Sequence, residues 1–410
     1  MKILQINKFF YLKGGSETHM FELSDALKKR GHEVAFFSMT DKRNVHGEWN
    51  KYFIDNVDYK KFNFLKSFKV AFDFLYNFSA KKKLQKLIND FKPDIAHLHN
   101  IYHQLSPSIV DVLRKNNIPI LMTLHDYKII CPNYQLFSKN KVCTKCRGGK
   151  FFYCALNCCV KNSFSKSFLA MLEAYLHNRI LKTYDKVDLF IAPSEFIKDV
   201  FVNFGFDEKK IKVKYNFVPV FGGSFKEDKE EEYVLYYGRL SPEKGVDILL
   251  EAAGELPDVQ LKIVGEGEQY QEIKHQIMER GLVNRVELLG FKAGSELRNL
   301  ILGAKVIVIP SVWYENMPYA LLEAMALGKI VLVSRIGGLG EVITNEENGF
   351  SFEAGNVNGL KRRICQAISL PESKKRDMSK AAREFANNLS LNNYLGGLEG
   401  LYSEVIELKR

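Results

Sequence analysis

The stretch VIVIPSVWYENMPYALLEAMALG, residues 306–328, joins a short β-branched run to a longer apolar run with helical spacing. The alternating valines and isoleucines of Val306–Ile309 favour a buried strand. Pro318 suits the first position of a helix and Gly328 suits its end, so the second part is predicted to be helical. A strand that leads through a loop into a helix is the repeating unit of a parallel α/β sheet.

Two carboxylates stand out in this unit. Glu315 falls in the loop after the strand, and Glu323 falls inside the helix among apolar neighbours. A carboxylate in such surroundings is costly unless it is paired or hydrogen-bonded, and a ribose diol of a ligand would be one suitable partner. The alternative, a loop charge and a polar helix stripe, fits poorly because so few neighbours are polar.

The same alternation of strands and helices runs through both halves of the chain, which predicts two parallel α/β sheets. The predicted strands are Lys2–Ile6, Glu33–Ser38, Asp94–His97, Ile118–Leu124 and Leu189–Ala192, followed by Tyr233–Tyr237, Gln260–Val264, Arg285–Leu289, Val306–Ile309 and Ile330–Ser334. Glycines followed by a charge run make Phe221–Glu232 typical of a linker.

We therefore expect two Rossmann-like domains, residues 1–217 with a cysteine-rich insertion at 131–160, and residues 218–410. Their sheets would face an interdomain cleft, and ligands would bind outside the carboxyl ends of the strands. A last helix is predicted over Asn393–Arg410. Its apolar pattern fits a helix that caps its own domain and equally one that crosses back to the first domain.

Two further strand ends carry residues suited to phosphate. Gly14 and Gly15 lie between the strand Lys2–Ile6 and a helix predicted over Thr18–Arg30, where backbone N–H groups can approach an anion. A tight turn that needs glycine is an equally good explanation of this pair. Arg239 and Lys244 follow the strand Tyr233–Tyr237, and both cations suit a diphosphate. Their place at a strand end favours this role over two solvated surface charges.

The charge balance is basic, with 59 Lys+Arg against 48 Asp+Glu and a formal net charge of +11. Such a surface suits anionic partners: nucleotide phosphates, nucleic acid or an acidic membrane. We expect no nucleic-acid partner, because no RNA- or DNA-binding motif accompanies the charge. Polar residues interrupt the N-terminal apolar run, which therefore does not resemble a signal peptide. No apolar run is long enough to span a bilayer, so we expect a cytoplasmic protein.

Six of the seven cysteines cluster between residues 131 and 159. Cys143 and Cys146 form a C-x2-C pair, and Cys131 and Cys159 bracket it. Four thiolates from one insertion could hold a structural zinc. Reduced packed thiols and a redox pair are the alternatives.

Residues 51–83 combine lysines with aromatic residues. The segment holds eight lysines, at 51, 60, 61, 66, 69, 81, 82 and 83, against three acids. Leu65, Phe68, Phe72, Leu75 and Tyr76 share one helical face. This pattern fits a basic amphipathic helix on an anionic membrane surface, and equally a set of core aromatics with solvated lysines.

The order and spacing of these motifs resemble the retaining GT-B glycosyltransferases of the group-1 family, glycosyltransferase family 4, along nearly the whole chain. The matching pieces are Gly14–Glu17, Arg30–Val34, Pro93–Asn100, Thr123–Asp126, Gly238–Leu240, Glu243–Gly245, Val264–Gly267, Glu315 with Glu323, Gly337–Glu341 and Asn348–Phe350.

The resemblance implies a nucleotide diphosphate sugar as donor, bound mostly by the second domain. Arg239 and Lys244 would hold the diphosphate and Glu323 the ribose. Glu315, with the backbone of Asn316 and Met317, would contact the transferred sugar. His125 would approach that sugar from the first domain, and Gly14 and Gly15 would lie near the phosphates. No Asp-x-Asp sequence occurs, so the cations are expected to replace a catalytic divalent metal.

The sequence thus predicts a retaining hexosyltransferase-type enzyme of cell-surface polysaccharide synthesis. Its acceptor would be a glycan or a lipid-linked glycan, with the protein peripheral on the inner face of the cell membrane. The alternative is a catalytically silent member of the same fold that binds a nucleotide sugar or a partner protein.

Overall fold

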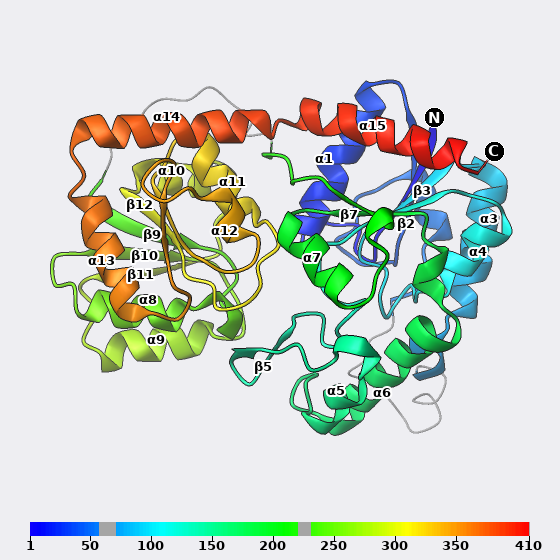
Figure 1. Ribbon diagram of the computed structural model, residues 1–410, viewed down its shortest axis with the longest axis horizontal. Helices are drawn as coiled ribbons and strands as arrows, with labels where there is room; N and C mark the ends of the chain where they lie inside the picture. The colour runs from blue at the N-terminus through cyan, green and yellow to red at the C-terminus, as the bar shows by residue number, and fades with distance from the viewer. Residues whose placement is uncertain (57–70, 220–230, 410) are drawn as a thin grey trace. The chain divides into compact units, whose positions relative to one another are not determined.

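The computed structural model describes residues 1–56, 71–219 and 231–409. The chain divides into two units. Unit 1 comprises Met1–Ser138, Cys143–Tyr215 and Leu391–Arg410, and unit 2 comprises Lys139–Val142 and Asn216–Ser390. Each unit is an α/β structure built on its own six-stranded sheet (Figure 1).

The sheet of unit 1 has the order β2-β1-β3-β4-β7-β8, and all neighbouring strands are parallel. Its strands are β1 (Lys2–Ile6), β2 (Glu33–Phe37), β3 (Ile95–Leu98), β4 (Ile120–Thr123), β7 (Leu189–Ala192) and β8 (Ile211–Val213). Its α-helices are α1 (Gly15–Lys29), α3 (Phe78–Phe91), α4 (Ile109–Lys115), α5 (Phe152–Leu156), α6 (Phe164–Tyr175), α7 (Glu195–Asn203) and α15 (Leu391–Glu407). The insertion after β4 also carries the two-residue strands β5 (Phe137–Ser138) and β6 (Lys141–Val142).

The sheet of unit 2 is also parallel, with the order β11-β10-β9-β12-β13-β14. Its strands are β9 (Tyr233–Tyr237), β10 (Gln260–Val264), β11 (Val286–Gly290), β12 (Val306–Ile309), β13 (Val331–Ser334) and β14 (Phe350–Phe352). Its α-helices are α8 (Val246–Gly254), α9 (Tyr270–Glu279), α10 (Gly294–Gly303), α11 (Tyr319–Ala326), α12 (Leu339–Val342), α13 (Val357–Ile368) and α14 (Glu372–Asn388).

Strand order fixes where a ligand site can form. In unit 2 the order reverses between β9 and β12, because the chain proceeds from β9 to β10 on one side and from β12 to β13 on the other. In unit 1 the reversal lies between β1 and β3. Loops at such a reversal diverge and leave a crevice at the carboxyl ends of the strands.

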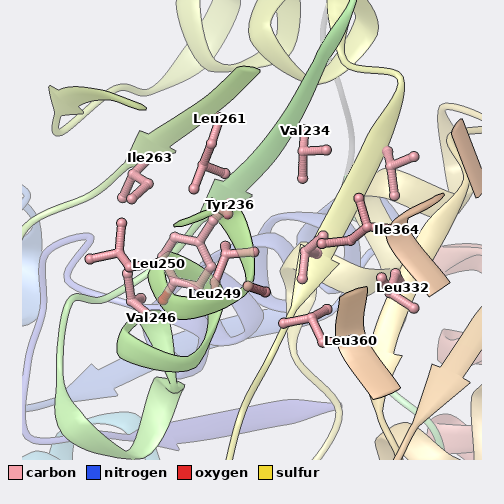
Figure 2. Packing of buried hydrophobic residues seen from close by; sticks show 14 of the residues in the cluster. Val234, Tyr236, Val246, Leu249, Leu250, Leu261, Ile263, Leu332, Leu360 and Ile364 are labelled. Atoms are coloured by element: carbon pink, nitrogen blue, oxygen red, sulfur yellow. The ribbon is translucent and has the colours of Figure 1, made fainter. Parts of the chain in front are cut away.

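The core of unit 2 lies between the sheet and the helices α8 and α13 (Figure 2). Val246, Leu249 and Leu250 of α8 are buried on one helical face, as the spacing i, i+3, i+4 requires. They pack in the same cluster as Val234 of β9 and Leu261 of β10. This packing anchors the β9–α8 connection, which carries Arg239 and Lys244.

The predicted two-sheet α/β architecture is confirmed, while several predicted element ends were wrong by a few residues. Five strand predictions match in full: Lys2–Ile6, Leu189–Ala192, Tyr233–Tyr237, Gln260–Val264 and Val306–Ile309. The edge strands β8 and β14 were missed, since they are only three residues long. The helix predicted over Thr18–Arg30 begins earlier, at Gly15.

The last helix, α15, belongs to unit 1. Leu395, Leu398 and Val405 are buried, as their spacing predicts, whereas Leu408 is exposed. Glu399 pairs with Arg30 at 2.8 Å and lies 3.0 Å from His32, and both partners follow α1. The end of the chain therefore packs beside the first helix of the sequence.

Candidate active site

The predicted donor-binding residues of unit 2 follow the two strands at its reversal of order. Arg239 and Lys244 come after β9, and Glu315, Asn316 and Met317 come after β12. Because β9 and β12 are hydrogen-bonded neighbours, both loops leave the same edge of the sheet. This edge is where a parallel α/β sheet binds its ligand.

Two glycines hold these loops in close contact. Gly245 has φ +68°, and a Cβ there would lie 2.1 Å from the carbonyl oxygen of Pro310. Gly337, after β13, has φ +61°, and its Cβ would lie 2.3 Å from the carbonyl oxygen of Glu315. The Gly338 N–H donates to the same carbonyl over 2.8 Å. The backbone around Glu315 is therefore fixed by its neighbours.

An ion pair between a buried carboxylate and a partly exposed ammonium joins the two loops. Lys244 Nζ lies 2.5 Å from Glu315 Oε1, and the Ser311 hydroxyl donates to the same oxygen over 2.6 Å. Burial alone would raise the pKa of Glu315, but the Lys244 cation and the hydrogen bonds from Lys244, Ser311 and Trp313 outweigh it and lower that pKa. Glu315 is thus a carboxylate, and it holds the Lys244 ammonium beside the Trp313 ring, 5.3 Å from its centroid.

Arg239 differs from Lys244 in its surroundings. Its side chain is exposed, directly after the β9 strand and Gly238. Tyr236 donates its hydroxyl hydrogen to the Arg239 carbonyl oxygen over 2.7 Å, which fixes the backbone there. Within the described ranges, the Arg239 guanidinium makes no ion pair. No carboxylate of the described residues therefore neutralises its charge.

The loop after Glu315 ends at helix α11. Pro318 is the residue before the first helical position, so the prediction that it occupies that position was wrong by one residue. The Met317 carbonyl oxygen accepts a hydrogen bond from Asn216 Nδ2 at 2.9 Å. In the part of the chain that the structure describes, the N–H of this buried residue has no acceptor. Glu323 lies in α11 and is partly exposed between buried neighbours.

In unit 1, Gly14 and Gly15 lie at the start of α1. Gly14 is the residue before the helix and is exposed, with an extended φ of −173° that any residue can adopt. A Cβ at Gly14 would meet only Glu17 Oε2, at an ordinary 3.8 Å. The fold of the described residues thus gives no reason for glycine at this position.

The predicted His125 belongs to a buried cluster of imidazoles. His99 Nδ1 lies 2.8 Å from His125 Nε2, and His99 Nε2 lies 2.8 Å from Gln5 Oε1. Because an amide oxygen only accepts, His99 donates to Gln5, and His125 therefore donates its Nε2–H to His99. Burial lowers the pKa of His125 to about 3, so its ring is neutral at physiological pH.

Other members of the cluster connect β3 to α15 by hydrogen bonding. His97 lies 2.7 Å from the Tyr402 hydroxyl of α15 and 2.8 Å from Thr123 Oγ1. Its ring stacks on that of His99, with centroids 4.4 Å apart. His19 of α1 meets His125 edge-on, at 5.1 Å. The orientation of His125 is thus set by buried neighbours on several elements.

Sequence reasoning missed the residues that support the predicted ones. Ser311 and Gly338 fix Glu315, and Gln5 and His99 fix His125. Gln5 carried a signal in the sequence, because a polar residue interrupts the apolar strand Lys2–Ile6. The structure shows that Gln5 is fully buried, where a polar group needs a hydrogen-bond partner. His99 carried another, since it alternates with His97 and directly follows β3.

The four cysteines of the predicted zinc site, together with Cys154, line one small cavity in the insertion. As the side chains lie, however, no three His, Cys, Asp or Glu residues of the described chain are arranged to hold a metal ion. Burial raises the pKa of the Cys131 thiol to about 11. The zinc site therefore stays a prediction without geometric support. Elemental analysis of protein purified without chelator tests it, with about one zinc per chain expected for such a site.

The basic segment 51–83 is described only in part, and Lys60, Lys61, Leu65, Lys66, Phe68 and Lys69 lie outside the described residues. Among the described lysines, Lys83 Nζ donates to the Phe53 carbonyl oxygen over 2.6 Å and pairs with Asp55. Lys81 bonds the Tyr76 hydroxyl and lies 3.9 Å from Asp111. These two cations serve contacts within unit 1. In the described ranges, no helix is both long and apolar enough to cross a membrane.

Models of known protein families match the sequence of both units. Residues 13–220 match the family model "Glycosyltransferase Family 4", and residues 222–385 match "Glycosyl transferases group 1". An uncharacterized glycosyltransferase of Methanocaldococcus jannaschii is 28% identical over 408 residues, which is 99% of this chain and 99% of that protein. An Escherichia coli UDP-Gal:alpha-D-GlcNAc-diphosphoundecaprenol alpha-1,3-galactosyltransferase is 30% identical over 178 residues, which is 41% of this chain and 44% of that protein.

The fold also matches solved structures. An Anabaena protein in complex with UDP and glucose superposes with a TM-score of 0.70 at 20% identity, covering 98% of this chain and 100% of that one. The resemblance and the GT-B fold expected from the motifs are both confirmed. The family models cover the loops of both sheets that carry the predicted site, and the chain is therefore a member of glycosyltransferase family 4 with the GT-B fold.

Proposed function

We propose that this glycosyltransferase transfers a sugar, with retention of anomeric configuration, from a nucleotide diphosphate sugar to a glycan or lipid-linked acceptor. The observation that carries the proposal is the Lys244–Glu315 pair at the reversal of strand order in unit 2, together with Arg239 of the same loop as Lys244, which forms no ion pair within the described residues. Cations and a fixed carboxylate at this edge suit a donor with both phosphates and hydroxyls.

The diphosphate is the leaving group in this reaction. As the bond between the anomeric carbon and the phosphate oxygen breaks, its electron pair departs with the diphosphate, where negative charge grows. Arg239 can offer two N–H groups to phosphate oxygens, and Lys244 can donate to a phosphate while one of its hydrogens stays on Glu315. Both cations would be more strongly bound to the transition state than to the intact donor, which lowers the barrier.

These cations also support transfer without a catalytic divalent metal. The sequence has no Asp-x-Asp motif to coordinate a metal against the diphosphate. Arg239 and Lys244 supply positive charge at the strand ends where the diphosphate is proposed to bind.

The loop after β12 would bind the transferred sugar. Glu315 Oε1 already accepts hydrogen bonds from Lys244 and Ser311. The remaining lone pairs of this carboxylate would accept hydrogen bonds from sugar hydroxyls, and its ion pair would hold the loop in position. The Met317 N–H provides a donor, and Asn316 lies between the two. Glu323 is the proposed partner of the ribose hydroxyls, because it lies in α11 and is partly exposed.

From unit 1 we propose two contributions. Gly14 and Gly15 would allow the backbone at the start of α1 to approach a phosphate. His125 would contact the transferred sugar as a neutral imidazole whose orientation is set by His99.

The acceptor is proposed to be lipid-linked on two grounds. The E. coli relative named above acts, by its name, on a diphosphoundecaprenol-linked sugar. The chain is basic, with a formal net charge of +11, which suits work at an anionic membrane. With such an acceptor, the enzyme would act in the synthesis of cell-surface polysaccharide.

A panel of nucleotide sugars tests the proposal. The protein is incubated with each in the presence of chelator, and the release of nucleoside diphosphate is followed. We expect slow hydrolysis of one donor, faster turnover with a diphosphate-lipid acceptor, and retention of configuration by NMR. Binding of a nucleotide sugar without any turnover would instead favour the silent, partner-binding member of the fold.

A further inference from the structure

The segment between β4 and β7 exposes an apolar surface that the proposed donor site does not explain. It is formed by the helices α5 and α6, which contact each other (Figure 1). Five large apolar side chains on these helices are exposed: Phe152 41%, Leu156 69%, Phe164 59%, Phe168 43% and Leu172 37%. Large exposed apolar patches mark an interaction site more often than single exposed side chains do.

On α6 the apolar residues form a stripe. Phe164, Phe168 and Leu172 are spaced i, i+4, i+8, and the rings of the two phenylalanines stack with centroids 6.0 Å apart. The buried residues of the helix, Ala170 and Ala174 among them, lie on another face. The stripe is therefore turned away from the core that holds α6 in place.

The charge around this stripe has one sign. Between Cys143 and Leu172 the sequence contains Lys145, Arg147, Lys150, Lys161 and Lys166, and no aspartate or glutamate. The next carboxylate, Glu173, is buried in an ion pair with Lys128 at 2.6 Å. Within the described residues, the four exposed lysines of this stretch form no ion pair.

The surface is held in shape by its own small core and by hydrogen bonds. Cys146, Phe151 and Cys154 pack with Ala174 of α6 in one small core. Arg147 donates from Nε to the Asn203 carbonyl oxygen over 2.8 Å, and Arg179 donates to the Gly148 carbonyl oxygen over 2.5 Å. A surface that is ordered before binding loses little conformational entropy when it binds.

We propose that this α5–α6 surface, defined by the five apolar residues and by Lys145, Lys150, Lys161 and Lys166, docks on an anionic lipid bilayer. Aromatic and leucine side chains enter the boundary between headgroups and acyl chains, while lysines around them bind anionic headgroups. A protein partner would need a large apolar patch ringed only by carboxylates, whereas a bilayer with acidic lipids offers both properties everywhere. The charge pattern therefore favours lipid.

This assignment differs from the segment 51–83 that the sequence singled out. There Lys81 and Lys83 contact groups of unit 1, whereas the lysines of the α5–α6 surface form no ion pair with any residue that the structure describes. Bilayer binding by this surface does not depend on donor chemistry, so its failure would leave the proposed transferase activity untouched.

The test is co-sedimentation of the full chain with vesicles of phosphatidylcholine, alone or mixed with phosphatidylglycerol. We expect the protein to sediment with the mixed vesicles at low ionic strength, and binding to weaken in salt. K161E/K166E should lower the partition coefficient by about tenfold or more. The matched control K82E/K86E changes the net charge equally, at two exposed lysines of α3, and should leave binding within about twofold of the wild type.

A second variant separates the apolar contribution. F164S/F168S keeps every charge and should also lose vesicle binding, with a circular dichroism melt confirming that it is folded. Three results would overturn the proposal: wild-type protein that ignores the mixed vesicles, equal losses in K161E/K166E and K82E/K86E, or self-association through this surface without vesicle binding. Light scattering on the wild type and F164S/F168S detects the last.

Discussion

Lys244 Nζ and Glu315 Oε1 lie 2.5 Å apart, and this pair links the loop after β9 to the loop after β12. The sequence had assigned the two residues to different parts of the donor, the diphosphate and the sugar. The structure joins them, so a substitution of either residue acts on both loops. Stability and catalysis can still be separated, because a buried pair can be replaced as a pair.

The first prediction concerns this pair. Lys244→Met leaves Glu315 buried without its cation, and we expect a loss of about 3–5 kcal/mol in the free energy of unfolding. The double variant Lys244→Met/Glu315→Gln removes both charges and should recover most of that loss. Neither variant should recover transfer, because the cation facing the diphosphate is gone. Urea unfolding and initial rates measure both quantities. A double variant as active as the wild type would remove Lys244 from the donor site.

The second prediction concerns Arg239, whose side chain is exposed and makes no ion pair in the described part of the chain. Arg239→Ala should leave the free energy of unfolding unchanged. It should lower kcat/KM by a factor that corresponds to a loss of about 2–4 kcal/mol in transition-state stabilisation. Arg362→Ala, at another exposed arginine of unit 2, is the control and should change neither. Equal kcat/KM for the wild type and Arg239→Ala would rule out a role on the diphosphate.

The third prediction uses the open space at Gly14. A methyl group there meets only Glu17 Oε2 at 3.8 Å, and the backbone is extended, so Gly14→Ala should fold as well as the wild type. If phosphate approaches this backbone, the same methyl group should weaken donor binding by about tenfold or more. Gly254→Ala, at an equally open glycine in α8, is the control for the substitution itself. Calorimetric titration with the donor compares the three proteins. Unchanged affinity in Gly14→Ala would remove Gly14 from the donor site.

The sequence predicted the architecture well because strand–helix alternation is a local pattern. Val306–Ile309 is apolar throughout, and its strand ends where Pro310 ends the pattern. The edge strand β8 was missed because its three residues are too few to show the apolar pattern of a strand. Contacts between distant residues were beyond reach for a different reason. The distances from Lys244 to Glu315 and from His97 to Tyr402 depend on strand order and on helix packing across 71 and 305 residues of sequence.

The last prediction concerns the dependence of stability on pH. Burial lowers the pKa of His97 and of His125 to about 3, and the pKa values of His19 and His99 are lowered as well, also chiefly by burial. In the unfolded chain each imidazole titrates near 6.5. Between these values the unfolded chain binds protons that the folded chain does not. Stability is therefore complete above about pH 6.5 and falls as the pH drops toward 3.

For one imidazole with these two pKa values, the loss between pH 7.5 and pH 5 is about 2 kcal/mol. Urea unfolding at the two pH values measures the sum over these four histidines and over His103 and His177, whose pKa values burial also lowers. His97→Asn should reduce the difference between the two pH values by about that amount, even though it also weakens the fold at pH 7.5. His275→Gln, at an exposed histidine paired with Glu279, should leave the difference unchanged. If the wild type is equally stable at both pH values, burial does not lower the pKa values of these histidines, and His125 would then take up a proton as the pH falls from 7.5 to 5.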